Sequence, residues 1–444
     1  MIPLTKGTQR GITRMELCTT LLIKIVIPDN EVVPIECLIQ TIKAQEIERK
    51  TAEAVLNTID DIKTCELCGE KYSRTCDNRL YCRAGTSTRT ISTTIGEISF
   101  QQHKIKNMET NNIFKPIQSL ISFSGKQKYQ RDIIMVSVDF AEKMSYRDTV
   151  TELSLIASSV PSRTTINNYA KIVGEQIPIQ HEDANLEVAI GDGTKTHSQE
   201  PNVSQNDVKV LIGLEDKKKV LLGITVNQSW AQMAKTLEDE HVLNEYATIV
   251  SDGEVELKNA FSNGNKQFQM DIIHGFRMLG FKLWEDKELN LDERKQIINE
   301  LKSILLSLKN TVLYHKDDKN KIKVKMNETV NKMKVLSDHL KEIGCKKAAN
   351  FIRDYSNTLV TFARLSLEGI EVPWNSNIIE RLMGEIAKRV KHKWMRWTTR
   401  GLESLLRLIL VRYTDNGKYS AFRDWYSGKS ICANINITVI INPK

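Results

Sequence analysis

The spacing of apolar residues in the first 105 positions predicts a helix followed by a β-hairpin. Residues 39–59 carry apolar side chains at the 3.6-residue period of a helix. The apolar side of this helix consists of Ala44, Ile47, Ala54, Val55 and Ile59, with Thr51 filling the gap. Residues 89–105 instead alternate Thr and Ile with other residues, as paired strands do, and Gly96 lies at the expected turn.

Two shorter helical patterns follow at residues 145–157 and 162–177, separated by the sequence SSVP. Ser162 is a suitable N-cap for the second helix. The apolar face of that helix consists of Ile166, Tyr169, Ala170 and Val173. This is the pattern of a helix-turn-helix, in which Arg163 and Thr164 are the candidate DNA contacts. An ordinary helical hairpin has the same pattern, and on this match alone it is the preferred interpretation.

A different pattern begins at residue 186, where short and almost continuously apolar runs appear. These β-branched runs occupy residues 186–197, 208–215, 217–226 and 247–253. Such runs are typical of strands buried in the middle of a layered sheet, and the second and third are close enough to pair as a hairpin. A helix after Asp252, a strand at 268–270 and a helix through His274 complete an α/β pattern.

The next part of the chain is predicted to be entirely helical. Phe281 to Ile343 contains neither Gly nor Pro, and its apolar residues recur at helical spacing. We therefore expect a helical bundle over residues 285–370, closed by Pro373, and then one long helix over residues 377–413.

Composition indicates an ordinary globular protein of several domains. The 444 residues are 41% hydrophobic and 27% charged, which excludes disordered and fibrous classes. No apolar run approaches the roughly 20 residues of a membrane helix, and the first residues lack the order of a secretion signal. We therefore expect a soluble, cytoplasmic protein without membrane contact, associated with the nucleoid if it is prokaryotic.

Positive charge is concentrated in one segment. The whole chain has 63 basic and 55 acidic residues, a net charge of +8. Residues 376–412 alone hold nine basic and three acidic residues, so this segment accounts for +6. The basic run consists of Lys388, Arg389, Lys391, Lys393, Arg396 and Arg400, interleaved with Trp394 and Trp397. A one-sided basic run with aromatic residues favours a nucleic-acid surface over an ordinary solvated helix face.

Three acidic residues are candidates for catalysis. Asp192 and Asp252 each end a predicted buried strand and precede a glycine, and ligands gather at strand ends in α/β sheets. Asp-Gly is also a common turn dipeptide, so either residue alone has a simple structural explanation. Glu380 follows Asn377 by three residues in the first turn of a predicted helix, where a capping box would account for the same spacing.

Four of the eight cysteines form a cluster with the spacing C-x₂-C-x₇-C-x₅-C. They are Cys65, Cys68, Cys76 and Cys82. The first pair, followed by Gly69, has the sequence of a zinc knuckle. The second pair is too widely spaced for a regular site, so a structural zinc ion and four reduced cysteines both stay open.

The order of these features resembles the catalytic region of DDE transposases, in particular the Mutator-like group and related bacterial and archaeal insertion-sequence transposases. The resemblance covers residues 186–413. Asn377-Ile-Ile-Glu380 before the basic run is similar to that group's Asn-x-x-Glu helix. Asp271-Ile-Ile-His274 is similar to its Cys/Asp-x-x-His element. Residues 144–175 resemble the helix-turn-helix that precedes its core, and Thr93-Thr-Ile-Gly96 resembles the β-segment after its zinc ribbon.

The resemblance implies an α/β ribonuclease-H-like catalytic core with an all-α insertion. It implies that Asp192 bridges two Mg²⁺ or Mn²⁺ ions, that Asp252 and Glu380 hold one each, and that His274 assists. A packed structural histidine is an equal alternative, and Glu385 is a second choice for the third acid. Two tryptophans near this region, Trp230 and Trp284, are candidates for stacking on a base, although a lone Trp is more often part of a core.

The implied partners are transposon terminal inverted repeats, target DNA and a second copy of the chain. We expect a helical region at 1–60, a zinc-ribbon-like β unit at 61–110, a helix-turn-helix region at 111–180, a core at 186–284 and 373–415, an insertion at 285–372 and a tail at 416–444, to which no role is assigned. The alternatives are a non-catalytic nucleic-acid-binding protein on the same core and a nuclease that cuts without strand transfer.

Overall fold

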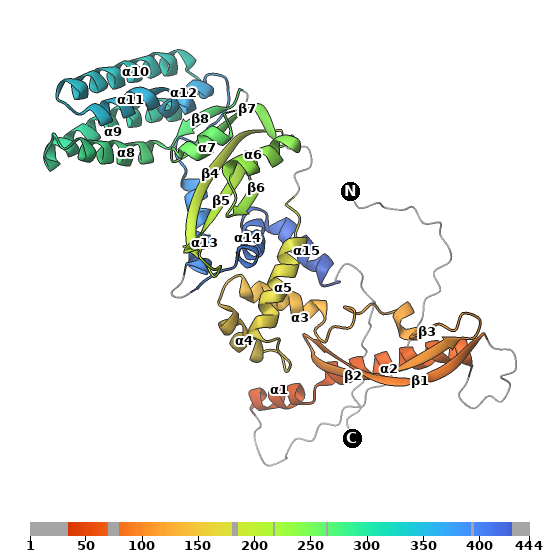
Figure 1. Ribbon diagram of the computed structural model, residues 1–444. Coiled ribbons are helices and arrows are strands. Elements are labelled where there is room, and N and C mark those ends of the chain that lie inside the picture. Colours follow the sequence, from red (N-terminus) through yellow and green to blue (C-terminus); the bar gives the residue numbers. More distant parts are fainter. Residues whose placement is uncertain are drawn as a thin grey trace.

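The computed structural model describes residues 34–69, 80–179, 185–215, 218–262, 265–391 and 395–428. Within these residues the chain forms an α/β core, two groups of helices and a separate N-terminal sheet (Figure 1). The helical insertion lies at one end of the molecule and the N-terminal sheet at the other, with the core between them. None of the described helices combines the length and the apolar character that a membrane crossing requires.

The N-terminal unit is a long hairpin that packs on one helix. Its elements are α1 (Ile35–Ala44), α2 (Ile47–Cys68), β1 (Tyr81–Thr93), β2 (Gly96–Asn107), β3 (Ile113–Phe114) and a 3₁₀ turn, η1 (Pro116–Ser119). The predicted hairpin turn is confirmed, because Thr93 pairs with Gly96 and Gly96 has a φ of +116°. The predicted helix is also confirmed, although it is divided into α1 and α2 at Gln45 and Glu46.

Side chains of α2 satisfy the open edge of β2. The pairs are Ser99 N–H to Glu53 at 2.9 Å, Gln101 N–H to Asn57 at 2.8 Å and His103 N–H to Asp60 at 2.7 Å. An edge strand with free N–H groups is open to pairing with another chain. Here one face of a helix provides the missing acceptors.

Three helices join the N-terminal unit to the core: α3 (Arg131–Ala141), α4 (Tyr146–Ser154) and α5 (Arg163–Gln176). The predicted helix pair is confirmed as α4 and α5, and the Ser162 hydroxyl accepts the Thr165 N–H at 3.2 Å as an N-cap. Helix α5 packs closely on a helix of the core. A Cβ at Gly174 would lie only 2.1 Å from the backbone oxygen of Ser404, so this crossing requires a glycine.

The core is a five-stranded mixed sheet with the order β6-β5-β4-β7-β8. Its strands are β4 (Leu186–His197), β5 (Gln205–Glu215), β6 (Lys218–Val226), β7 (Leu243–Ser251) and β8 (Gln267–Met270). The strands β4, β5 and β6 are antiparallel, whereas β4, β7 and β8 run parallel. All of the strands predicted in this region are present.

Helices cover both faces of this sheet. They are α6 (Trp230–Asp239) and α7 (Val255–Ala260) on one face, and α13 (Asn377–Val390) and α14 (Thr399–Thr414) on the other. Alternate residues of β4 divide between two apolar clusters. Ala189 packs with α6 and α7, whereas Ile190 packs with α13 and α14. Helix α15 (Asn416–Tyr426) follows and contacts α3.

The chain between β8 and α13 is all helical, as predicted, although its first helix begins at Ile272 and not at residue 285. It contains α8 (Ile272–Asp286), α9 (Leu291–Tyr314), α10 (Lys319–Glu342), α11 (Lys346–Leu359) and α12 (Thr361–Ser366). Apolar residues that recur at helical spacing are buried inside the bundle, among them Leu301, Leu305, Met333 and Leu336.

The prediction of one continuous helix over residues 377–413 is wrong. The chain leaves the helix after Val390 and begins α14 only at Thr399, with the Thr398 hydroxyl as N-cap. Backbone pairing with β4 takes the place of helical hydrogen bonds here. The Trp397 N–H donates to the His197 oxygen at 3.1 Å, and the Gln199 N–H donates to the Trp397 oxygen at 2.9 Å.

Candidate active site

Strand register brings the two candidate aspartates to the same edge of the sheet. Strands β4 and β7 are parallel neighbours in which Ile190 is opposite Val250. Asp192 and Asp252 each lie two residues farther along, so they are at equivalent positions beyond this pair. Ile190 and Val250 both face the cluster that contains α13. Because strand side chains alternate with a period of two, both aspartates are directed to the α13 side.

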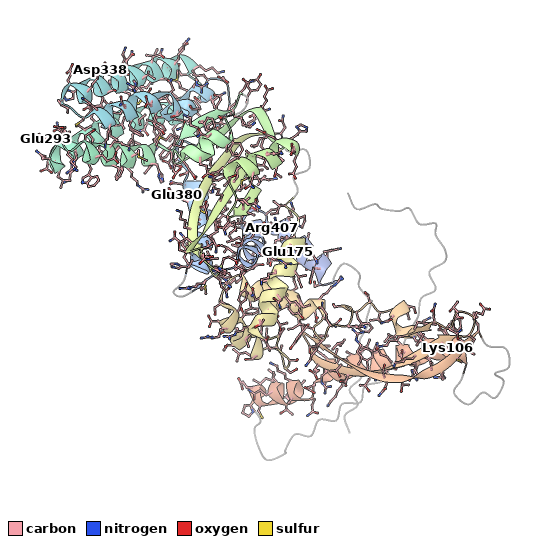
Figure 2. The ribbon with its side chains drawn as sticks, in the orientation of Figure 1. Lys106, Glu175, Glu293, Asp338, Glu380 and Arg407 are labelled. Atoms are coloured by element: carbon pink, nitrogen blue, oxygen red, sulfur yellow. The ribbon has the colours of Figure 1, made fainter. Side chains whose placement is uncertain are left out.

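Helix α13 brings the third acid to this edge. Glu380 is in the first turn of α13, beside the sheet (Figure 2). The Glu380 Oε1 lies 3.1 Å from Nε2 of His274, which belongs to the first turn of α8. Glu385, the other candidate, instead pairs with Lys388 at 2.6 Å. The structure therefore groups Glu380 rather than Glu385 with His274.

Asp271 joins the beginnings of the two helices that carry His274 and Glu380. Its Oδ1 accepts the N–H groups of Ile273 at 2.6 Å and His274 at 3.2 Å, as the N-cap of α8. Its Oδ2 accepts the N–H of Ser376 at 2.8 Å and the Ser376 hydroxyl at 2.6 Å, immediately before α13. The Asp271 side chain is buried, at 0% exposure. Asn377 was predicted as the N-cap of α13, but it is the first helical residue, and Ser376 occupies the N-cap position.

The electrostatic surroundings of Asp192 include the other three candidate side chains. Burial raises the pKa of Asp192 to about 6 from an ordinary 3.8, and the negative charges of Asp252 and Glu380 contribute to the increase. The Gly193 N–H, which donates to Asp192 at 2.7 Å, and His274 act in the opposite direction. The raised pKa therefore reflects mainly the burial of the Asp192 carboxylate, and the two neighbouring acids are smaller causes.

The carboxylates at this edge have oxygen atoms available to a ligand, and one group of possible metal ligands lies among the described residues. Asp192 and Asp252 each use one carboxylate oxygen to accept a backbone N–H, from Gly193 and Glu254 respectively. Ligand atoms of Asp271, His274 and Glu380 also lie within 4.8 Å of one another. Asp271 is a poor ligand all the same, because four donors already occupy its two oxygens. Hard cations such as Mg²⁺ prefer carboxylate oxygens, and Asp192, Asp252 and Glu380 each carry one at this edge of the sheet.

The sequence was compared with models of known protein families, and one of them matches most of the chain. The family model described as "Transposase, Mutator family" matches residues 32–420 of the 444. The chain belongs to the Mutator family of transposases. No curated protein sequence matches the chain significantly. Transposases cut and join DNA, so the protein is an enzyme that acts on DNA.

One basic residue of the transposase, Lys391, lies near its acidic site. The Lys391 Nζ donates to the Thr194 hydroxyl at 2.5 Å, two residues beyond Asp192 on β4. Arg396 is exposed in the segment between α13 and α14. The predicted contacts Lys393 and Trp394 lie outside the described residues. The backbone of Trp397 lies beside the end of β4, with which it pairs. The Trp397 oxygen also accepts a hydrogen bond from the Asn206 side chain at 3.0 Å.

Two residues of the predicted DNA surface are in the interior of the transposase. Arg389 is only 3% exposed; it donates to the Ala141 oxygen at 2.7 Å and lies against the rings of Tyr146 and Trp397. Trp397 is 6% exposed and its indole donates to the Val390 oxygen at 3.0 Å, which caps α13. Both side chains hold α13 against the α3–α4 region, and we leave them out of the DNA surface.

The remaining predicted contacts are exposed. Arg163 and Thr164 lie in the first turn of α5 and are open to solvent. Lys388 forms the surface pair with Glu385, and Arg400 forms a two-bond pair with Glu175 at 2.5 and 2.9 Å. Exposed pairs of this kind contribute little to stability, so phosphate groups can replace the carboxylate partners at small cost.

The cysteines of the transposase occupy a different setting from the one predicted. Cys65 and Cys68 lie in the last turns of α2 rather than on a knuckle turn, and Cys82 lies on β1. Cys76 lies outside the described residues. Among the described residues the cysteines do not form a group of three or more possible metal ligands. Zinc binding stays a prediction.

Sequence reasoning missed a second acidic group behind the site. The Glu254 carboxylate accepts the Trp230 indole N–H at 2.9 Å, and burial raises the pKa of Glu254. The sequence feature that could have revealed Glu254 is its position two residues after Asp252.

The two tryptophans predicted as stacking candidates differ in their exposure. Trp230 is fully buried and therefore part of the core, whereas Trp284 is exposed.

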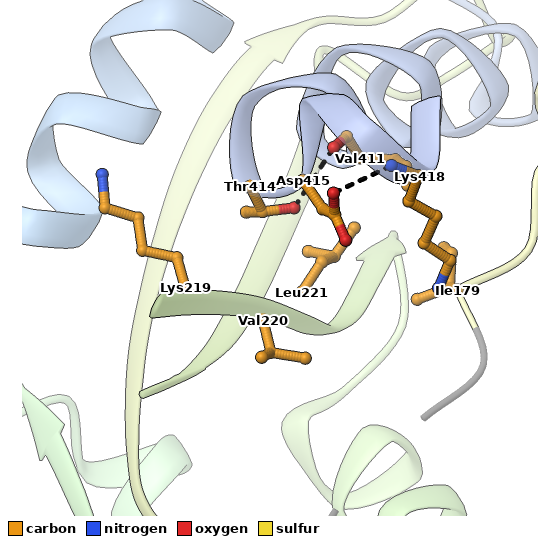
Figure 3. Close-up of a pocket in the computed structure, with 8 residues that line it drawn as sticks. All are labelled: Ile179, Lys219, Val220, Leu221, Val411, Thr414, Asp415 and Lys418. Atoms are coloured by element: carbon orange, nitrogen blue, oxygen red, sulfur yellow. Dashed lines mark hydrogen bonds between the residues drawn. The ribbon is translucent and has the colours of Figure 1, made fainter. Parts of the chain in front are cut away.

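A small pocket elsewhere on the transposase is separate from this site (Figure 3). It lies between β6 and the end of α14, and the residues that line it are Ile179, Lys219, Val220, Leu221, Val411, Thr414, Asp415 and Lys418. None of the acidic candidates belongs to its lining.

Proposed function

We propose that the chain is a DDE transposase, which cleaves DNA at transposon ends and transfers the ends into target DNA through Asp192, Asp252 and Glu380. The observation that carries the proposal is that the charges of Asp252, which follows β7, and Glu380 on α13 both act on Asp192 within the neighbouring strand β4. The family membership supplies the substrate, which is DNA.

The sheet supports a ribonuclease-H-like description of the core. The supporting observations are the three antiparallel strands followed by two parallel strands and the helices on both faces of the sheet. The first aspartate lies within the central strand β4, the second follows the parallel neighbour β7, and the third acid comes from a helix after the insertion.

The carboxylates of Asp192, Asp252 and Glu380 would hold Mg²⁺ or Mn²⁺. When bound, such ions neutralise charge on the phosphodiester and lower the pKa of an attacking water or hydroxyl. The protein has the task of holding its carboxylates in place. His274 orients Glu380 through the 3.1 Å contact, and Asp271 fixes the two helix ends from which these side chains project.

The basic segment next to β4 would hold the DNA backbone. Lys391 is anchored two residues from Asp192, and Arg396 is exposed farther along the segment. Cationic side chains at this place attract phosphate and displace counterions. Helix α5 would act as the second helix of a helix-turn-helix. Its exposed first turn, with Arg163 and Thr164, would contact the DNA end.

Two transposon ends have to be joined to one target, so we propose that the active form is a dimer or a larger assembly. A strand-transfer assay tests the function as a whole. Purified protein is incubated with Mg²⁺, a labelled DNA fragment carrying the inverted repeats that flank its own gene, and a target plasmid. Label in the plasmid supports transposition, cut ends without joining indicate a nuclease, and binding without cutting contradicts catalysis.

A further inference from the structure

Helix α8 carries an aromatic surface that continues outward from the acidic site. One side of α8 packs into the bundle through Ile272, Phe276, Leu279 and Leu283. The opposite side carries His274, Arg277, Phe281 and Trp284, at successive spacings of three, four and three residues. These spacings place the four side chains on one face of the helix.

The outer part of this face is unusual for a solvent-facing helix, where polar residues are the norm. Phe281 is 50% exposed and Trp284 is 57% exposed. Their rings are stacked, with centroids 5.8 Å apart and an interplanar angle of 29°. The Lys282 Nζ lies 5.5 Å from the centre of the Phe281 ring, and Arg277 is exposed one turn closer to His274. Flat aromatic rings beside cationic side chains form a suitable surface for a nucleobase and its phosphate.

We propose that Phe281 and Trp284 stack on an unpaired base of the DNA strand whose phosphodiester lies at the carboxylates. The inference rests on the proposed function for the position of that strand. Ten residues separate His274 from Trp284, which corresponds to ~15 Å along the helix axis. At ~3.4 Å per base step, the stacked base lies about four steps from the phosphodiester. Trp284 thereby selects DNA in which a base near the cut is free to leave the duplex.

The chain provides a matched control on the opposite side of the core. Trp425 on α15 is 54% exposed, and its ring lies 5.8 Å from that of Phe422, three residues earlier. This pair has the same composition and spacing as Phe281 and Trp284, and Trp425 is about as exposed as Trp284, whereas Phe422 is buried, at 7% exposure. It differs in place, because α15 packs next to α3 and α14, whereas α8 begins at the acidic site.

Binding measured in EDTA tests the proposal without any cleavage step. The probes are a blunt 20-base-pair duplex, the same duplex with a four-nucleotide 3′ single-stranded extension, and that extension with abasic sites. The full-length wild-type protein should prefer the extended duplex to both other probes. Trp284→Ala should lose this preference, binding the extended duplex about 5- to 100-fold more weakly while binding the blunt duplex as before. Trp284→Phe should keep most of the preference, and Trp425→Ala all of it.

Unchanged affinity of Trp284→Ala for the extended duplex overturns the proposal. Equal losses in Trp284→Ala and Trp425→Ala also overturn it, as does a wild-type protein that binds all three probes equally. The blunt duplex reports whether each variant still folds. Failure of the DDE assignment would appear separately, as absent metal-dependent cleavage with the stacking preference intact.

Discussion

Replacing Asp271 with asparagine should detach α13 from α8 while leaving the cap of α8 in place. Asparagine is as good an N-cap as aspartate, so its oxygen can still accept from Ile273 and His274. The amide nitrogen that replaces Oδ2 then faces the Ser376 N–H, which donates at 2.8 Å in the wild-type protein. Two donors cannot bond to each other, and Ser376 is buried, at 3% exposure.

The size of the effect follows from these contacts. A buried N–H without an acceptor costs about 1–3 kcal/mol, and a hydrogen bond to a charged group contributes about 1.5–3 kcal/mol. These two contributions overlap, so the free energy of unfolding should fall by about 2–4 kcal/mol. Displacement of Glu380 by ~1 Å should also slow metal-dependent DNA cleavage about 100-fold. Ser376→Ala removes only the hydroxyl bond and should cost ~1 kcal/mol.

Urea unfolding followed by circular dichroism measures the first effect, and cleavage of labelled DNA in Mg²⁺ measures the second. The control is Asp318→Asn, a change of the same kind at the N-cap of α10, where Asp318 accepts only the Lys321 N–H at 2.9 Å. This control should behave like the wild-type protein. The reasoning is refuted if Asp271→Asn keeps the wild-type urea midpoint and cleavage rate, or if Asp318→Asn costs as much.

Three further predictions concern the acids and the basic segment. Lys391→Ala should weaken DNA binding and reduce the salt slope of log K by about one, measured by fluorescence anisotropy from 50 to 300 mM salt; an unchanged slope removes Lys391 from the interface. Glu380→Gln should abolish Mg²⁺-dependent cleavage and Glu385→Gln should leave it near wild type, because only Glu380 contacts His274; the opposite result would assign the third acid to Glu385. Without metal, the raised pKa of Asp192 means that the folded state binds the proton of this carboxyl more tightly than the unfolded state does. The protonated carboxyl therefore contributes to stability below pH ~4, and this contribution is lost as the pH rises through about 6. Asp192→Asn in EDTA should therefore be more stable than wild type at pH 7.5 by about 3 kcal/mol, with little difference at pH 4. Equal urea midpoints at both pH values would contradict the assignment.

The aspartates and the sheet could be predicted from the sequence because their signals are local. Asp192 and Asp252 each end a short run of apolar β-branched residues, and such runs form neighbouring buried strands. Helix α6 was missed although its capping box, Ser229 with Gln232, is visible in the sequence. The same local reasoning found the helices of the insertion, since their apolar periods are long and uninterrupted.

Features that depend on distant partners could not be predicted. The break between α13 and α14 arises because Trp397 pairs with the end of β4, about 200 residues earlier in the chain, and not from any helix-breaking residue. Charge alone predicts that Arg389 is exposed, yet two aromatic rings and a helix-end carbonyl surround it. The role of Asp271 depends on Ser376, which lies 105 residues further along the chain.

The most direct test of the central claim compares wild-type protein with Asp192→Asn on DNA that carries the inverted repeats flanking the gene. Each protein is incubated with Mg²⁺, and binding and cleavage are measured in the same samples. The account predicts that both proteins bind the DNA with similar affinity and that only the wild type cleaves it. Metal-dependent cleavage by Asp192→Asn at the wild-type rate, or its absence in both proteins, would contradict the account.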